Sequence, residues 1–196
     1  MKSYALLLSF LISLFSIAPA AATSLLPISL EQLSTRSSLI FYGSVVSNQV
    51  KKDTISGRIV TFTEFEVIEL IKGSSEKTHS IKQLGGRLEN TQTISRIHGI
   101  PQYQVGNRYV VFLPKESSLG FCSPLGLHQG SFTVTTVDGE QIISNGHSLA
   151  QQSSRIISDE VATRSSVQVP LAVNKNKPSQ ANLYDFINSV RAFNAR

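Results

Sequence analysis

The sequence predicts a mainly β protein, a small five- to six-stranded antiparallel barrel that is closed or nearly closed and bracketed by two helices. Short runs of β-branched and aromatic residues recur between turn residues, which is typical of such folds. Residues 58–72 (RIVTFTEFEVIELIK) form the longest of these runs. Its apolar residues change parity between Phe62 and Phe65, as expected for a strand that carries a bulge and bends around a barrel.

The first part of the predicted domain contains a short helix and two strands. Ser29 and Gln32 have the spacing of a capping box, so a helix should begin there. Gly43 marks a bend or a close backbone approach in the first strand. The expected elements are a helix that ends near 37–38, a strand at 39–47, a polar hairpin connection at 48–57 and the long strand at 58–72.

The second part of the domain shows three further strand signals. In residues 78–84, Ile81 and Gln83 share one side of a strand that should end at Gly85-Gly86. Residues 108–114 have large apolar residues on both parities, which indicates a central strand. The other expected elements are an ordered loop at 87–106 with one short strand near 91–97, a loop at 117–130, and strands at 131–137 and 140–144 joined by Asp138-Gly139.

The C-terminal region divides into a polar segment and a helix. Residues 148–180 are rich in serine, and we expect either an irregular, partly mobile excursion or a short helix around 154–163. Residues 182–193 have apolar side chains at helical spacing, and Asn182 or Ser179 can cap this amphipathic helix.

The N-terminus has the layout of a secretory signal peptide. Lys2 precedes an apolar run, and small residues follow, so cleavage is expected after Ala20 or Ala22. A membrane anchor is the alternative, but the run is short for a bilayer and Pro19 ends it. We expect export to the periplasm or the extracellular space, with no membrane span after cleavage. The expected division is 1–22 signal peptide, 23–145 β-barrel domain with its N-terminal helix, 146–181 polar excursion and 182–196 C-terminal helix.

Composition limits the function only weakly. The chain has 196 residues, 41% of them hydrophobic, which suffices for one domain with a core. Its net charge of +5 is scattered and fits an ordinary solvated exterior as well as contact with an anionic surface. Cys122 is the only cysteine, so no intrachain disulfide forms and packing must stabilise the domain.

The order of these features resembles a known family. The strand SLIFYGSVVS, the ribbon ending in IELIKG, the Gly85-Gly86 strand end and the segment GIPQYQVGNRYVVFL are similar to small uncharacterised bacterial exported proteins. They also resemble the netrin-like barrel of the tissue inhibitors of metalloproteinases, an OB-fold. The resemblance spans residues 37–137 and implies an OB-like barrel, with a metallopeptidase as the partner class.

One departure from that family matters for mechanism. The inhibitors chelate the catalytic zinc of their target through an N-terminal cysteine. Here the mature chain would start near Thr23, and Cys122 lies deep in the sequence. The inhibitory mechanism therefore carries over to no residue of this chain.

No constellation of residues predicts catalysis or a cofactor. Cys122 and His128 lie in one loop and could form a thiolate nucleophile, but no orienting partner or oxyanion hole can be assigned, so a buried free thiol is the preferred interpretation. Glu64 and Glu66 share a parity on the long strand, where a solvated face explains them. The histidines lack the spacing of metal ligands, so no metal site is predicted.

A few residues are candidates for ligand binding. Gly85, Gly86 and Arg87 could approach a ligand closely or form an anion-binding nest, although a tight turn is the simpler interpretation. Tyr103 lies in the loop that follows them. Nucleic-acid binding is not expected, because the strand aromatics have apolar or acidic neighbours rather than basic ones.

Three functional hypotheses remain from the sequence. The preferred one is an exported, non-enzymatic binding module that engages another protein through loops or an exposed barrel face. The second is a binder of an envelope glycan or a small ligand that uses the loop at 85–106. The third is a thiol enzyme that uses Cys122.

Overall fold

The computed structural model describes residues 26–89, 91, 93–147, 149 and 179–195. The predicted signal peptide and the alternative helix at 154–163 lie outside these residues. In the part of the chain that the structure describes, no helix is both long and apolar enough to cross a membrane.

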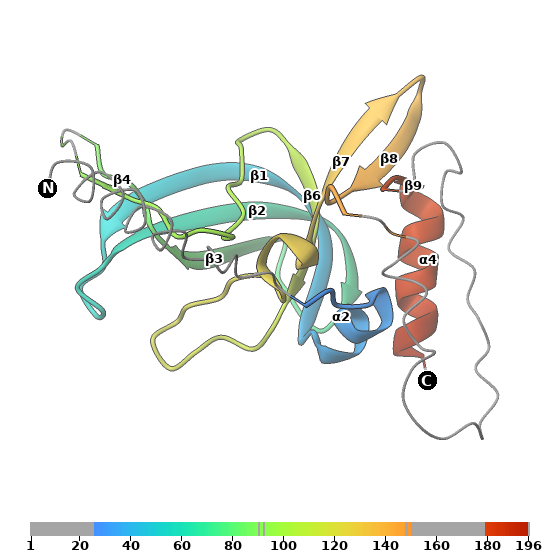
Figure 1. Ribbon diagram of the computed structural model, residues 1–196, viewed down its shortest axis with the longest axis horizontal. Helices are drawn as coiled ribbons and strands as arrows, with labels where there is room; N and C mark the ends of the chain where they lie inside the picture. Colours follow the sequence, from blue (N-terminus) through green and yellow to red (C-terminus); the bar gives the residue numbers. More distant parts are fainter. Residues whose placement is uncertain (1–25, 90, 92, 148, 150–178, 196) are drawn as a thin grey trace, which may run out of the picture.

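The fold is mainly β, built on a seven-stranded antiparallel sheet with the order β3-β2-β1-β6-β7-β8-β9 (Figure 1). A second, two-stranded sheet pairs β4 with β5. The elements are α2 (Leu30–Arg36), β1 (Leu39–Lys52), β2 (Ile59–Lys72), β3 (Thr78–Leu84), β4 (Gly86–Arg87), β5 (Ile94–Ser95), β6 (Arg108–Leu113), the 3-10 helix η1 (Leu127–Gly130), β7 (Ser131–Val137), β8 (Glu140–Ser144), β9 (Ala181–Asn182) and α4 (Leu183–Asn194).

The mainly β class is confirmed, but the predicted closed or nearly closed OB-like barrel is not. Strands β3 and β9 are the two edges of the large sheet and do not pair with each other in the described part of the chain. At the edge formed by β3, the backbone N–H of Cys122 donates to the carbonyl of Lys82 at 2.9 Å. A loop therefore lies where a closed barrel would place a strand. The sheet stays open, and it has seven strands instead of the five or six expected.

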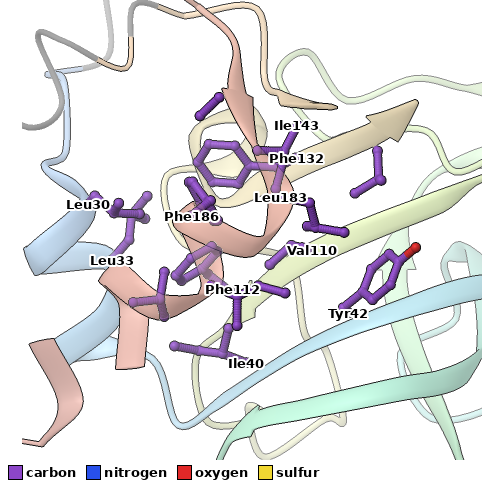
Figure 2. Close-up of a cluster of buried hydrophobic side chains, with 14 of the residues drawn as sticks. Leu30, Leu33, Ile40, Tyr42, Val110, Phe112, Phe132, Ile143, Leu183 and Phe186 are labelled. Atoms are coloured by element: carbon purple, nitrogen blue, oxygen red, sulfur yellow. The ribbon is translucent and has the colours of Figure 1, made fainter. Parts of the chain in front are cut away.

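A core lies on each face of the sheet. The first is covered by α2 and α4, and Figure 2 shows Phe186 of α4 pointing toward Phe132 and Phe112, with ring centroids 4.8 and 6.2 Å away. The second core, on the opposite face, consists of Leu39, Phe41, Val45, Phe65, Ile81, Tyr103, Tyr109, Val111, Leu113 and Cys122. Strand β6 contributes to both cores, which confirms that residues 108–114 are a central strand.

Both helices begin as the sequence predicts. The Ser29 hydroxyl accepts from the backbone N–H of Gln32 at 3.1 Å, and the Gln32 side chain accepts from the N–H of Ser29 at 3.0 Å. This capping box satisfies N–H groups that have no partner within the helix. At α4, the Asn182 side chain accepts from the N–H of Tyr184 at 2.9 Å.

Strands β1 and β2 form a long ribbon that extends away from α4 (Figure 1). The register of their pairing shifts at three places, because Val46 of β1 and Ile68 and Ile71 of β2 have no paired residue in the other strand. Val46 lies opposite the predicted change of parity. The predicted bulge is therefore confirmed, but it is shared between the two strands.

Gly43 makes the close backbone approach that the sequence suggested. A Cβ atom there would lie 2.7 Å from the carbonyl oxygen of Glu66 and 3.1 Å from the Phe41 ring. Such distances are too short for a side chain, so glycine allows β1 and β2 to stay paired at this bend.

The turn between β1 and β2 is shorter than predicted, because β1 continues to Lys52. A buried ion pair fixes this turn to β3. The Lys82 ammonium lies 2.9 Å from an Asp53 carboxylate oxygen and donates to the Leu119 carbonyl at 2.8 Å. The hydrogen bond from Lys82, helped by Ser56, lowers the pKa of Asp53 to about 2. The pair lies on the face of β3 opposite Ile81 and Gln83, since successive side chains of a strand alternate.

Candidate ligand-binding hollow

A polar hollow lies over strands β1, β2 and β3, beneath the segments that follow β3. We call this cavity of about 150 Å³ the strand hollow. Its lining residues are Asn48, Val50, Thr61, Thr63, Gln83, Leu84, Gly86, Arg87, Ile100, Pro101, Gln102 and Tyr103. Residues far apart in the sequence therefore meet at one site.

Hydrogen bonds fix the polar side chains of the strands in the hollow. Thr63 donates to the side-chain oxygen of Asn48 at 2.7 Å, and the Asn48 amide donates to the Tyr103 carbonyl at 2.8 Å. The Thr61 hydroxyl donates to the Gly85 carbonyl at 2.7 Å. Two of these bonds connect the strands to the segments that cover them, and the bond between Thr63 and Asn48 joins β2 to β1. Together they use both threonine hydroxyl protons.

Gly86 is required where the covering segment meets the strands. Its φ of +138° lies in a region that L-residues rarely adopt, and a Cβ would lie 2.6 Å from Val50 Cγ1 and 2.7 Å from Thr61 Oγ1. Glycine therefore lets the backbone lie directly on the side chains of β1 and β2. This close approach forms one wall of the hollow.

Gln83 is one of two lining residues, with Tyr103, that have a buried side-chain polar atom without a hydrogen-bond partner among the described residues. Its side chain is only 3% exposed, yet its Nε2 meets no hydrogen-bond partner among the described residues. A buried polar group without a partner costs about 1–3 kcal/mol, so such groups are rare in native structures. The strand hollow therefore contains a donor for which the described residues supply no acceptor.

Arg87 supplies the charge at the hollow. It is the one charged residue in the described lining, and its side chain is exposed. No aspartate or glutamate of the described chain is part of this lining. The electrostatic environment therefore favours a ligand group with negative charge.

The structure brings together most of the predicted binding residues. Gly86, Arg87 and Tyr103 line the hollow, whereas Gly85 lies beside it and contributes its carbonyl to Thr61. The Tyr103 ring is 7% exposed and packs edge-on against Phe65, with centroids 5.0 Å apart. Burial raises the pKa of Tyr103. Tyr103 thus forms part of the wall of the hollow and anchors its loop to the sheet. Its ring is not exposed for a ligand to stack on.

Sequence reasoning missed Gln83, Asn48 and Thr63. The signal for Gln83 was present, because it shares strand parity with Ile81, which is fully buried. Asn48 was assigned to a hairpin connection, but it lies within β1. Thr63 is an ordinary strand residue in sequence, and only its hydrogen bond to Asn48 shows its place in the hollow.

A second, more open hollow shares Pro101 and Gln102 with the strand hollow. This loop hollow of about 480 Å³ is lined by uncharged amide and hydroxyl side chains, together with His128 and Tyr109. Its lining residues are Pro101, Gln102, Gln104, Asn107, Tyr109, His128, Ser131, Thr133, Ser144, Asn145 and Gly146.

The other residues considered for chemistry do not form one site. Cys122 is 2% exposed, and burial raises the pKa of its thiol to about 11, whereas a nucleophilic cysteine needs a lowered pKa. His128 lines the loop hollow, and Cys122 belongs to the second core. Glu64 accepts from the Ser47 hydroxyl at 3.2 Å, and Glu66 is exposed.

Metal binding has no candidate cluster within the described residues, where no group of three or more His, Cys, Asp or Glu side chains is suitably placed. The comparisons with protein-family models and with curated proteins give no match for this chain.

Proposed function

We propose that the protein is an exported, non-enzymatic binding module that takes a small polar ligand in the strand hollow. The observation that carries this proposal is the buried, unpartnered amide nitrogen of Gln83 within a hollow whose threonine and asparagine side chains are hydrogen-bonded. Of the hypotheses from the sequence, this geometry favours the glycan or small-ligand binder over the protein binder.

Gln83 differs from Asn48 and Thr63 because its buried amide nitrogen has no hydrogen-bond partner among the described residues. A structural glutamine in this position would be expected to hydrogen-bond to the backbone, as Asn48 does to Tyr103. A ligand that accepts a hydrogen bond from Gln83 removes the cost of the unpartnered group, so that cost becomes part of the binding free energy.

The chemistry of the hollow supports binding over catalysis. Its described lining has no carboxylate, histidine or cysteine that could serve as an acid, a base or a nucleophile. The thiol that the sequence offered as a nucleophile, Cys122, donates to the Pro114 carbonyl at 3.5 Å within the second core.

Thermal unfolding of residues 23–196 with a panel of envelope fragments tests this function. The panel should include neutral and acidic saccharides and short peptides. We expect at least one compound to raise Tm in the native protein and to have a smaller effect on Gln83→Met. The matched control is Gln49→Met, which makes the same change at an exposed glutamine on β1 and should keep the full shift. A panel without any effect on Tm would contradict the proposal.

A second candidate is a protein partner, with the metallopeptidase class suggested by the netrin-like resemblance. The observation that favours it is an open edge on β2, because β3 pairs with β2 only from Val60 to Glu66. Beyond this point Ile68 and Leu70 are 51% and 40% exposed. An extended segment of another protein could add to this edge as a strand.

Capture from the native secretome tests the second candidate. The native protein should retain a partner that Ile68→Lys with Leu70→Lys loses, because charges on an edge strand discourage strand addition. Equal recovery by both proteins would exclude this edge as the contact.

A further inference from the structure

We propose that the strand hollow recognises a carboxylate group, with Arg87 as its charge partner and Gln83 as a hydrogen-bond donor. This inference rests on the proposed function and names the chemical class of the ligand. It covers both a small acid and the acidic end of a larger molecule.

The charge at the strand hollow favours a carboxylate. Arg87 is the one ionised side chain in the described lining, and its guanidinium has no hydrogen-bond or ion-pair partner among the described residues. A guanidinium presents parallel N–H donors that match the two oxygens of a carboxylate. With no acidic residue in the described lining to compete, an anionic ligand meets attraction without repulsion.

The hydrogen-bond donors left free in the strand hollow also favour a carboxylate. The hydroxyl protons of Thr61 and Thr63 are used within the protein, and the Asn48 amide already donates to the Tyr103 carbonyl. Gln83 Nε2 has no acceptor, and an amide nitrogen can only donate. Gln83 and Arg87 are thus among the donors that remain for a ligand. The Tyr103 hydroxyl, also buried without a partner among the described residues, and the exposed Gln102 amide are others in the lining, and a group made of acceptors alone can satisfy such donors.

The size of the strand hollow suits a small ligand group. Pockets that enclose whole drug-sized molecules usually measure about 300–1,000 Å³. The strand hollow, with about 150 Å³, suits a group of a few heavy atoms. Its Gly86 wall cannot retreat to enlarge it without losing contact with Val50 and Thr61, since the backbone already lies directly on these side chains.

Isothermal titration calorimetry of residues 23–196 with two matched pairs of probes tests the inference. One pair is glucuronate and glucose, and the other is N-acetyl-alanine and N-acetyl-alaninamide. Within each pair only one compound carries a carboxylate. We expect at least one acid to bind at least about tenfold more tightly than its neutral counterpart. The pair that shows this difference identifies the source of the carboxylate as an acidic sugar or a peptide C-terminus.

Variants locate the binding site. Arg87→Gln should weaken binding of the acid by about tenfold or more, and Gln83→Met should weaken it as well, whereas Arg87→Lys should keep part of the affinity because it keeps the charge. Arg58→Gln removes the same charge from an exposed position near the β1–β2 turn and should leave binding unchanged.

The outcomes separate this inference from the broader function. Equal binding of acid and neutral compound, or binding of neutral compounds alone, overturns the carboxylate inference but leaves a polar-ligand binder. Binding of an acid that Arg87→Gln and Arg58→Gln weaken equally also overturns it, since the acid would then respond to net charge only. If none of the four probes binds, the carboxylate inference falls, and the panel of envelope fragments still decides the proposed function.

Discussion

Replacing Gln83 by methionine should make the protein more stable, which is the opposite of what most core substitutions do. The side chain is 3% exposed and its Nε2 has no partner among the described residues. Methionine keeps the length and the unbranched shape of glutamine but carries no amide. The substitution therefore removes a polar group that is buried without compensation.

The expected magnitude follows from two opposing contributions. An unsatisfied buried polar group costs about 1–3 kcal/mol, and its removal returns that amount to the free energy of unfolding. Imperfect packing after a volume-conserving exchange costs less than about 1.5 kcal/mol. The net change should be a gain of about 1 kcal/mol.

Equilibrium unfolding in urea measures this change. With a typical m-value of about 1–3 kcal/mol/M for a small protein, a gain of about 1 kcal/mol raises the midpoint by about 0.3–1 M. The control Gln49→Met lies on the exposed side of β1 and should change stability by no more than about 0.5 kcal/mol. A loss of 1 kcal/mol or more for Gln83→Met would refute the reasoning, because it would mean that the amide is hydrogen-bonded in the native protein.

Three further predictions concern groups outside the hollow. Since the pKa of Asp53 falls from 3.8 to about 2 on folding, its ionised form stabilises the protein above pH 3.8, and that contribution should disappear as the pH falls toward 2. The free energy of unfolding should therefore decline more steeply over this range in the native protein than in Asp53→Asn. Burial raises the pKa of Cys122 from 9.0 to about 11, which leaves about 100-fold less thiolate at neutral pH, so iodoacetamide should label it much more slowly in the native protein than in urea. Phe186→Ala should lower the free energy of unfolding by about 3–5 kcal/mol, since the ring is fully buried against Phe112 and Phe132.

Each of these predictions has a result that would count against it. Parallel pH profiles for native protein and Asp53→Asn would show that Lys82 does not hold the carboxylate in its ionised form. Rapid labelling of Cys122 without denaturant would place the thiol at the surface. A loss below about 1 kcal/mol for Phe186→Ala would mean that α4 does not pack on the sheet in the way the first core requires.

The longer strands were predictable because each depends on a local pattern, whereas the two-residue strands β4 and β9 were not predicted. The Asp138-Gly139 hairpin, the strand that contains Ile81 and the α4 cap at Asn182 follow from turn chemistry, parity and capping, which act over a few residues. Closure of the sheet depends instead on which edges meet. The alternation of side chains along a strand does not show which other strands pair with it. The open edge at β3 could therefore not be predicted from the sequence.

The strand hollow was predictable only in part, for a related reason. Glycines suggested a close backbone approach at Gly86, and the structure places that residue against Val50 and Thr61. The residues that Gly86 contacts, Val50 and Thr61, lie on two other strands, and the sequence does not show that these strands meet Gly86. The buried ion pair of Asp53 with Lys82 was missed likewise, because a charged residue in a polar strand pattern is expected to face solvent.

The most direct test of the central claim is a ¹H–¹⁵N NMR titration of residues 23–196 with whichever acidic probe binds more tightly. If the strand hollow takes a carboxylate, the side-chain amide signals of Gln83 and the backbone signals of Gly86 and Arg87 should shift together and saturate at one dissociation constant. Shifts confined to residues that line only the loop hollow, such as Asn107 or Gly146, would contradict the claim, and so would the absence of any shift at Gln83.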